Sequence, residues 1–492
     1  MTDQIHKVAE KAGAFMSALL EKERFSAFYQ KHRPTDKPRY LTLSVPYDNI
    51  DPLAVLELNA DPKGTRFYWE RPDHDIALAA GGRAALIKST GLDRFRTISR
   101  QADSLSSSLI SLSDVDHSMS GAHFVGGFSF FDQPMSGAWS TLGNASFVLP
   151  EWLLARDGRF SIMNITRKWS KEDRMDELGD WYREWMQSFN ERLQIRINDS
   201  YILSDEDFPS ESFRIEEREE DRKRWLTNVE IAKNAIQYQQ FKKIVLAREL
   251  RFQVPSRISS TKFIHCLRKD YPSCYSFIYQ LNGEAIFLGT TPEKLLSRQG
   301  PYLKTEALAG STSRGVTATS DTIFAKKLLE SKKNQEEHAY VLESIKEKLR
   351  PITETLDHPA VPFIKKYSNV QHLCTPVSAS LSGTVNSIHL VSRLHPTPAV
   401  GGYPESIAID HIQEMEQLER GWYAGPVGWF NTRDKAEFSV AIRSALIQNK
   451  HVRIFAGCGI VEESDPQTEW EETRIKLLPM QKGLGYALHR SS

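Results

Sequence analysis

Three glutamates in the C-terminal half have the spacing of a site for a hard divalent cation. Apolar residues follow Glu337 at one and two helical turns, so its carboxylate would lie in line with an apolar face and would need a partner there. Glu469 and Glu472 are three residues apart and would share the face of a second helix. Mg2+ prefers oxygen ligands of this kind. The alternative is surface glutamates, with an ordinary salt bridge from Glu472 to Lys476 one turn later.

A lysine and a further glutamate could supply acid–base chemistry. Lys243 begins a run rich in β-branched and apolar residues, KIVLAREL, which predicts a buried strand. A lysine serves as a base at neutral pH when desolvation lowers the pKa of its ammonium group; a strand-end lysine that reaches water is the alternative. Glu293 follows Thr291-Pro292 after a strand-like segment. We expect it at a turn from which its side chain projects into a cleft, unless it is a solvated or helix-capping residue.

Two further features could bind a carboxylate. Gly457 and Gly459 in AGCG would let backbone N–H groups approach an anion closely, although no helix follows at once, so the segment is not a dinucleotide fingerprint. Arg443 alternates with apolar residues and can form a bidentate pair with a carboxylate or a cross-strand salt bridge. The residues alone therefore indicate a cation site near carboxylate-binding groups.

Composition narrows the class of protein. The 492 residues contain 63 Lys+Arg and 63 Asp+Glu, so the chain lacks the basic excess of a nucleic-acid binder. The four cysteines form no CxxC pair, which argues against a zinc site or a disulfide framework. The charged N-terminus does not resemble a secretory signal, and no run of about 18 apolar residues predicts a membrane span. We therefore expect a cytoplasmic protein that binds neither nucleic acid nor membrane.

The pattern of the chain predicts the elements that position these residues. It indicates an opening helix over residues 3–24, short β-like runs from about 40 to 203, and a mixed-charge junction over 214–225. In the second half it indicates a helix over 229–240 and strands at 243–250, 274–280, 284–298, 437–447 and 451–461. A loop over 310–315 should lead to one long helix over roughly 321–349, and Asp465-Pro466 should begin the last helix.

Ten strings in the second half carry a resemblance to a known family. They are KIVLAR, FLGTTPEKLLSR, ALAGSTSRG, KKNQEEH, VQHLCTP, LHPTPAVGGYP, GWYAGPVGW, AIRSA, FAGCGIVEESDP and EWEETRIK, in family order over roughly residues 225–487. FYWE, GGFSF and FVLP extend the likeness more loosely into the first half. On these strings the chain resembles the chorismate-utilising enzymes. The resemblance implies an α+β fold of large antiparallel sheets packed face to face with helices outside.

The same resemblance divides the chain and assigns roles to residues. Residues 1–224 would be the family's N-terminal half, part of the same fold, and 225–492 the chorismate-binding catalytic region. Lys243 matches the base that activates water to attack C2 of chorismate, and Glu293 the acid that protonates the departing C4 hydroxyl. Glu337, Glu472 and Glu469 match the Mg2+ ligands. Positions around the substrate and its carboxylates are matched by Gly310, Ser311, Ala399, Tyr423, Arg443, Gly457, Gly459 and Lys476.

Three positions favour the isochorismate synthase branch, in which water is the nucleophile. Amine-using relatives resemble one another in having Gln where this chain has Lys243. Aminodeoxychorismate synthases usually have a lysine where this chain has Ala309. Salicylate synthases, which go on to eliminate pyruvate, commonly have Thr at the place of Ala399. A salicylate synthase, an amine-using synthase and a non-catalytic chorismate binder remain the alternatives. Asn334-Gln335 departs from the Asp-Arg of several relatives and puts an auxiliary contact of the metal shell in doubt.

The resemblance also bears on cofactor, partners and pathway. It implies Mg2+ as the cofactor, chorismate as the small-molecule substrate and no obligatory protein partner. The product would feed menaquinone or siderophore biosynthesis. The long first half favours the quinone pathway.

Overall fold

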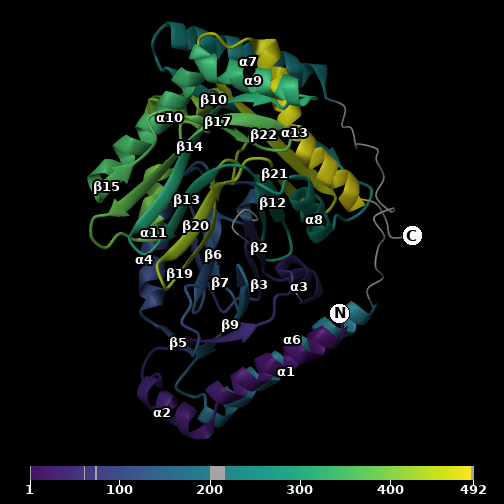
Figure 1. The fold of residues 1–492 in the computed structure, drawn as a ribbon, viewed down its shortest axis with the longest axis vertical. Coiled ribbons are helices and arrows are strands. Elements are labelled where there is room, and N and C mark those ends of the chain that lie inside the picture. The colour runs from purple at the N-terminus through teal and green to yellow at the C-terminus, as the bar shows by residue number, and fades with distance from the viewer. Residues whose placement is uncertain (1, 60, 62, 72–74, 200–216, 489–492) are drawn as a thin grey trace.

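Two large sheets form the body of the protein. The computed structural model describes residues 2–59, 61, 63–71, 75–199 and 217–488. Figure 1 shows the sheets in the middle, with one group of helices at the upper end and another at the lower end. The strand pairs are antiparallel except β1 with β5, so the expected fold class, α+β with antiparallel sheets, is confirmed.

The first sheet has twelve strands drawn from both halves of the chain. Their order is β18 (Gly402–Tyr403), β10 (Lys243–Gln253), β22 (His451–Ile460), β21 (Ser444–Gln448), β12 (Ile286–Thr291), β11 (Tyr275–Gln280), β2 (Arg66–Arg71), β3 (Ile76–Gly81), β8 (Trp152–Asp157), β9 (Phe160–Trp169), β1 (Arg39–Tyr47) and β5 (Leu109–Ser113). The pairing of β11 with β2 joins the halves within one continuous sheet.

The second sheet has ten strands and is joined across the halves in the same way, through β19 and β6. Its order is β15 (Thr353–Asp357), β17 (Val370–Leu381), β14 (Tyr302–Ser313), β13 (Lys294–Gln299), β20 (Lys435–Val440), β19 (Pro426–Asn431), β6 (His123–Phe128), β7 (Ala145–Leu149) and β4 (Ala85–Ser89), with β16 (Phe363–Lys366) beside β17. The predicted boundary at residue 225 falls inside a helix, α7 (Glu219–Gln237).

Alternation along the strands builds two cores. Phe67 and Trp69 of β2 pack into the core shared by the sheets, whereas Tyr68 between them packs into a second core on the other face of the twelve-stranded sheet. Successive side chains of a strand point to opposite faces, so both faces of this strand are apolar. Helices that contribute to the second core are α1 (Thr2–Leu19), α2 (Lys22–His32), α3 (Pro52–Asn59), α6 (Met175–Asp199), α8 (Ser260–Asp270) and α13 (Pro466–Leu488).

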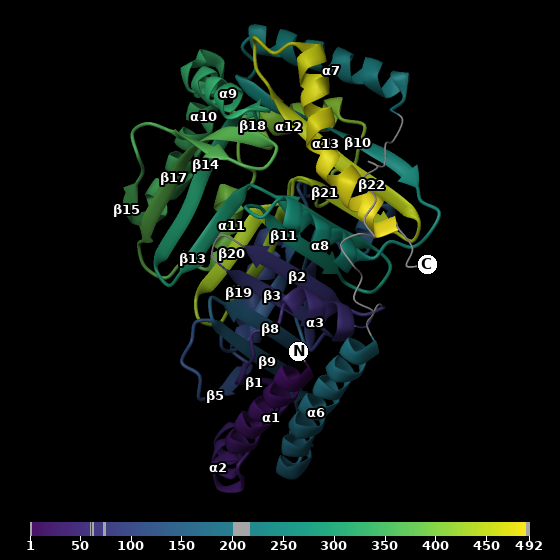
Figure 2. The ribbon, with the colours of Figure 1, turned by 45° about the vertical axis from the view of Figure 1, so that its right-hand side comes forward.

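Other helices lie against the ten-stranded sheet and around β10. Figure 2 shows α9 (Ala318–Glu330) and α10 (Lys332–Leu349) beside β14 and β17, with α13 across β22 on the other side of the upper end. The helices α4 (Arg94–Ser106) and α11 (Ser387–Leu394) pack on the ten-stranded sheet, and α7 and α12 (Glu405–Met415) pack around β10.

Two segments of the chain cross from one sheet to the other, and they lie side by side where they cross. The strand β12 of the first sheet continues through Pro292-Glu293 into β13 of the second, while β20 of the second continues through residues 441–443 into β21 of the first. Hydrogen bonds join the two crossings: Thr291 Oγ1 donates to the Val440 carbonyl at 2.8 Å, and the Val440 N–H to the Glu293 carbonyl at 3.1 Å. The sequence predicted strand-like segments over 284–298 and 437–447. The turn expected at Glu293 is present, whereas the break at 441–443 was not predicted.

Several helix predictions need correction. The opening helix predicted over 3–24 is divided into α1 and α2, because α1 ends at Leu19 and α2 begins at Lys22. The stretch predicted as one helix over 321–349 is two helices, because Ser331 ends α9 and caps α10 by accepting the Asn334 N–H. The part of the chain predicted as β-like also contains α3, α4 and the 25-residue α6.

One loop prediction needs correction, and the junction between the halves is partly helical. The predicted loop at 310–315 is mostly the end of β14, with a bulge at Gly310 (φ 74°). The mixed-charge junction at 214–225 is helical from Glu219, and Trp225 is buried against β10; residues 214–216 lie outside the described residues. No helix of the described residues is both long and apolar enough to cross a membrane.

Candidate active site

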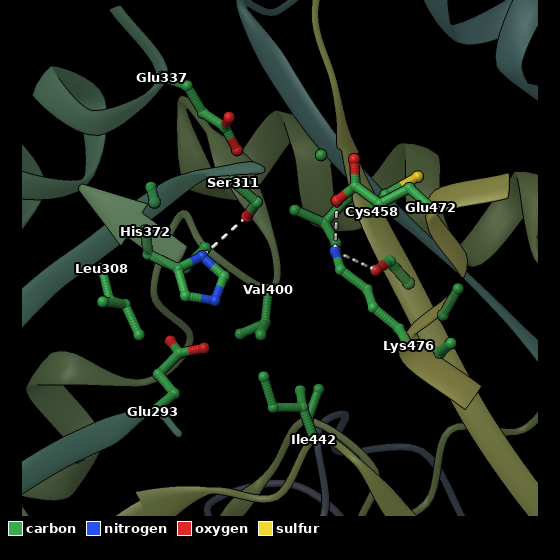
Figure 3. A pocket seen from close by; sticks show the side chains of 18 of the residues that line it. Glu293, Leu308, Ser311, Glu337, His372, Val400, Ile442, Cys458, Glu472 and Lys476 are labelled. Carbon is green, nitrogen blue, oxygen red and sulfur yellow. Dashed lines mark hydrogen bonds and ion pairs between the residues drawn. The ribbon is translucent and has the colours of Figure 1, made fainter. Parts of the chain in front are cut away.

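A cavity of about 220 Å³ opens where the two crossings meet α10 and α13. Every site residue expected from the sequence lines it except Lys243, which lies behind its wall. The lining includes Glu293, Gly310, Ser311, Glu337, Ala399, Tyr423, Arg443, Gly457, Gly459, Glu469, Glu472 and Lys476. Figure 3 shows Glu293 on one side of this space and Glu337, Glu472 and Lys476 on others. The roles of these residues remain predictions.

Glu293 is a buried carboxyl group that opens on the cavity. It stands at the crossing from β12 to β13, as the turn prediction required, and is 6% exposed. Burial raises its pKa to about 7, because the charged form loses its hydration, while a hydrogen bond donated by Thr397 to Oε1 at 3.2 Å opposes the rise. A carboxyl group with this pKa is substantially protonated near neutrality and can act as a general acid.

Lys243 is fully buried and paired with Glu337. Its Nζ lies 2.9 Å from Glu337 Oε1, with 0% of the lysine exposed. Gly459, on the neighbouring strand β22, leaves room for this pair: a Cβ there would lie 2.7 Å from Glu337 Oε1 and 2.9 Å from Lys243 Cε. The expected base therefore lies beside one expected metal ligand. Lys243 is the first residue of β10, but its side chain does not reach water.

Glu469 and Glu472 project from α13 and are each paired with a lysine. Lys333 Nζ lies 3.3 Å from Glu469 Oε1, and Lys476 Nζ lies 2.7 Å from Glu472 Oε1. Burial alone would raise the pKa of both carboxyl groups. It does so for Glu469, with Glu472 adding to the rise, whereas the Lys476 ammonium holds the pKa of Glu472 below its ordinary value. The i,i+4 salt bridge considered from the sequence is therefore present inside the cavity.

The chemistry of these three carboxylates fits Mg2+. Glu337, Glu469 and Glu472 face one cavity and offer hard oxygen ligands. Each is held by a lysine, and among the described residues no group of three or more His, Cys, Asp or Glu side chains is close enough to ligate an ion. The carboxylate oxygens that could ligate Mg2+ are therefore present around the cavity, and lysines balance their charges in the described structure.

Cations and donors in the cavity wall could bind carboxylates. Arg443 is buried at the second crossing with φ 48°, in the break between β20 and β21 rather than within a strand as the sequence predicted. Lys476 also donates to the Gly457 carbonyl at 2.9 Å, so its ammonium is held at the cavity wall. The Tyr423 hydroxyl lies near Gly457, where a Cβ would come within 3.2 Å of it.

His372 faces the cavity but received no role from the sequence. Its Nδ1 and Ser311 Oγ share a hydrogen bond at 2.8 Å, while its buried Nε2 has no partner among the described residues. Figure 3 shows the ring between Ser311 and Val400, with Nε2 toward the cavity. Burial lowers the pKa of His372 to about 3, so the ring is neutral near pH 7. The string VQHLCTP, which contains His372 and belongs to the family resemblance, was the signal in the sequence that could have indicated this residue.

Lys333 and Asn334 also line the cavity without having been predicted to do so. Gly310 must be glycine because it has a positive φ and because a Cβ there would lie 3.0 Å from Asn334 Cβ. Asn334 thus packs against the bulge of β14, and its amide donates to Ser331 Oγ at 2.8 Å.

Comparisons with known proteins agree with this arrangement. Residues 26–485 match the family model described as chorismate binding enzyme. The isochorismate synthase MenF of Bacillus subtilis is 32% identical over 89% of this chain and 92% of that protein. The salicylate biosynthesis isochorismate synthase of Pseudomonas aeruginosa is 32% identical over 91% of each. The solved structure of MenF, the menaquinone-specific isochorismate synthase from Escherichia coli, superposes with a TM-score of 0.70 at 25% identity, covering 94% of this chain and 100% of that one.

Two single replacements of glycines in β22 should differ in effect: one should lower the stability of the fold, and the other should mainly change the geometry of the site. In Gly457→Ala the new Cβ meets the Leu246 carbonyl of the main chain at 2.7 Å, so we expect a loss of about 1–3 kcal/mol in the free energy of unfolding. In Gly459→Ala the neighbours are the movable ends of Lys243 and Glu337, so the loss should stay below about 1 kcal/mol while the ion pair is displaced. Urea unfolding measures both; equal losses would contradict this account.

Proposed function

The chain belongs to the chorismate-binding enzymes, and from this premise we propose that it is an isochorismate synthase, which interconverts chorismate and isochorismate. The relatives named for menaquinone-specific and for salicylate biosynthesis share this step, whatever pathway then consumes the product. The observation that carries the proposal is Glu293, a buried acid with a pKa near neutrality that opens on the same cavity as Arg443 and Lys476.

The cavity can hold a substrate with two carboxylates. Chorismate is a dianion, and an anion leaves water at low cost only where cations and hydrogen-bond donors replace its hydration. Arg443 and Lys476 would bind one carboxylate from the wall opposite α10. Ser311 and the bulge at Gly310 lie nearer Glu337 and would contact the other.

Glu337, Glu469 and Glu472 would hold Mg2+ through their carboxylate oxygens. When bound, the ion would supply positive charge to a substrate carboxylate. In the described structure lysines neutralise these glutamates, and Lys333 and Lys476 would remain nearby as counter-charges. Lys243 must separate from Glu337 before its amine can accept a proton.

The reaction would use Lys243 and Glu293 on the two reacting carbons. A water oxygen forms a bond to C2 and gives its proton to the amine of Lys243. The ring double bonds shift, the C4–O bond breaks, and the departing oxygen takes the proton of Glu293 and leaves as water. Exchange with solvent then returns both groups to their starting states, and the reverse reaction exchanges their roles. General acid and base catalysis of this kind contribute about 10²–10⁴-fold each.

Product analysis tests the proposed function. Purified protein incubated with chorismate and Mg2+, without an amine, should give an equilibrium mixture of chorismate and isochorismate when resolved by liquid chromatography. Salicylate with matching pyruvate would place the chain among the salicylate synthases and show that Ala399 was misleading. Product that requires ammonia would place it among the amine-using synthases. Binding without any product would indicate a non-catalytic chorismate binder.

A pair of adjacent lysines tests the base. Lys243→Met keeps the length of the buried side chain but removes the amine, so turnover should fall by at least about 100-fold. Lys242→Met is the matched control, because Lys242 is the exposed residue immediately before β10, and should keep near-normal turnover. Thermal unfolding of both variants confirms that the fold persists. Near-normal turnover in folded Lys243→Met would remove Lys243 from the role of base.

A pair of adjacent glutamates tests the cation site. Glu472→Gln replaces an expected ligand oxygen by an amide nitrogen, and Mg2+ binding measured by calorimetry should weaken by at least about ten-fold, the scale on which even outer-shell changes act. Glu471→Gln changes the exposed neighbour, which pairs with Arg474 at 2.9 Å, and should leave the affinity unchanged. Equal affinities in the two variants would contradict the assignment of Glu472.

A further inference from the structure

Thr397 touches the expected acid but does not line the cavity. Its Oγ1 donates to Glu293 Oε1 at 3.2 Å, and the threonine is 7% exposed. We propose that Thr397 is a positioning residue, whose hydroxyl occupies one oxygen of Glu293 and thereby keeps the transferable proton on the other oxygen, toward the cavity. This inference rests on the proposed function, because it assigns the proton that Glu293 would deliver to the C4 oxygen.

A tight turn holds the hydroxyl in place. The Thr397 carbonyl accepts the Val400 N–H at 3.1 Å and the Gly401 N–H at 2.9 Å. The same turn brings Ala399 and Val400 to the cavity wall. The main chain therefore fixes the position of Thr397 independently of its contact with Glu293. A residue can orient another side chain only if its own position is fixed in this way.

The main chain around Glu293 is equally constrained. The Glu293 N–H donates to Thr291 Oγ1 at 3.2 Å, and its carbonyl accepts from Val440. The Tyr367 hydroxyl donates to the Pro292 carbonyl at 2.9 Å. With the backbone held at three points, the direction of the carboxyl group depends on its side-chain torsions and on Thr397.

Charged and titratable groups surround the carboxyl group without bonding to it. They come from five elements or connections: Lys243 of β10, Glu306 of β14, His372 of β17, Arg443 at the second crossing and Lys476 of α13. Among the described residues, the hydrogen bond from Thr397 is the one found at the Glu293 carboxyl group, and none is found at Oε2. Figure 3 shows this carboxyl group directed into the space below His372 and Val400.

The consequence for chemistry follows from donor and acceptor roles. In the protonated acid, an Oε1 that accepts the Thr397 hydroxyl is the carbonyl-like oxygen, so the proton resides on Oε2. In the ionised acid the same hydrogen bond stabilises the charge and lowers the pKa of Glu293 from the value that burial alone would impose. The hydrogen bond from Thr397 thus directs the proton of Glu293 to Oε2 and keeps Glu293 able to lose this proton near neutral pH.

Two variants separate the hydroxyl from the shape of the side chain. Thr397→Val keeps the shape and removes the donor, so the pKa of Glu293 should rise. Since the forward reaction needs the protonated acid, the fall of kcat/KM at alkaline pH should move to higher pH by about one unit. We expect kcat to decrease by about ten-fold, because the proton is no longer confined to Oε2, and KM to stay the same. Thr397→Ser retains the donor and should restore the wild-type profile.

A titration that does not depend on turnover completes the experiment. The infrared carboxyl band of Glu293, identified by its loss in Glu293→Gln, can be followed against pH in the protein without substrate. It should titrate near pH 7 in the wild type and in Thr397→Ser, and higher in Thr397→Val. An unchanged titration and kcat in Thr397→Val, or equal defects in the Val and Ser variants, would overturn the inference. Absence of turnover in the wild type would overturn the proposed function alone.

Discussion

The site depends on two paired strands that change sheets together. At the two crossings the backbone leaves one sheet and enters the other, and hydrogen bonds between Thr291, Val440 and Glu293 hold the crossing segments side by side. Side chains at such a point cannot be absorbed into either sheet, so Glu293 and Arg443 face the space between the diverging strands. The helices α10 and α13 then close this space and bring the remaining carboxylates to it.

Charge balance is the second constraint on the cavity. Burying a carboxylate without a partner is costly, and each of Glu337, Glu469 and Glu472 has a lysine within 3.3 Å or less. Among the described residues no lysine or arginine forms an ion pair with Glu293, so burial raises the pKa of its carboxyl group. The same cavity therefore contains two kinds of carboxyl group, three paired with cations and one able to carry a proton.

Local patterns predicted most elements but not the points where tertiary structure interrupts them. Runs such as that from Lys243 to Leu250 predicted strands correctly, because β-branched residues fit a buried sheet. The change of sheet at Pro292-Glu293 depends on partner strands far along the chain, so the sequence predicted a turn at Glu293 but not the sheet change. The helix break at Ser331 was not predicted either. Helical spacing and family resemblance placed the glutamates. The pairing of Lys243 with Glu337 and the contacts of His372 with Ser311 and of Thr397 with Glu293 could be seen only in the assembled structure.

The central claim is that the cavity adds water to C2 of chorismate while the C4 hydroxyl departs. The most direct measurement runs the reaction in water labelled with heavy oxygen and locates the label in isochorismate by mass spectrometry at early times. This account predicts that the C2 hydroxyl carries one labelled oxygen from solvent. Isochorismate whose C2 hydroxyl is unlabelled would mean that the hydroxyl migrates within the molecule, and would contradict the assignment of Lys243 and Glu293 as base and acid.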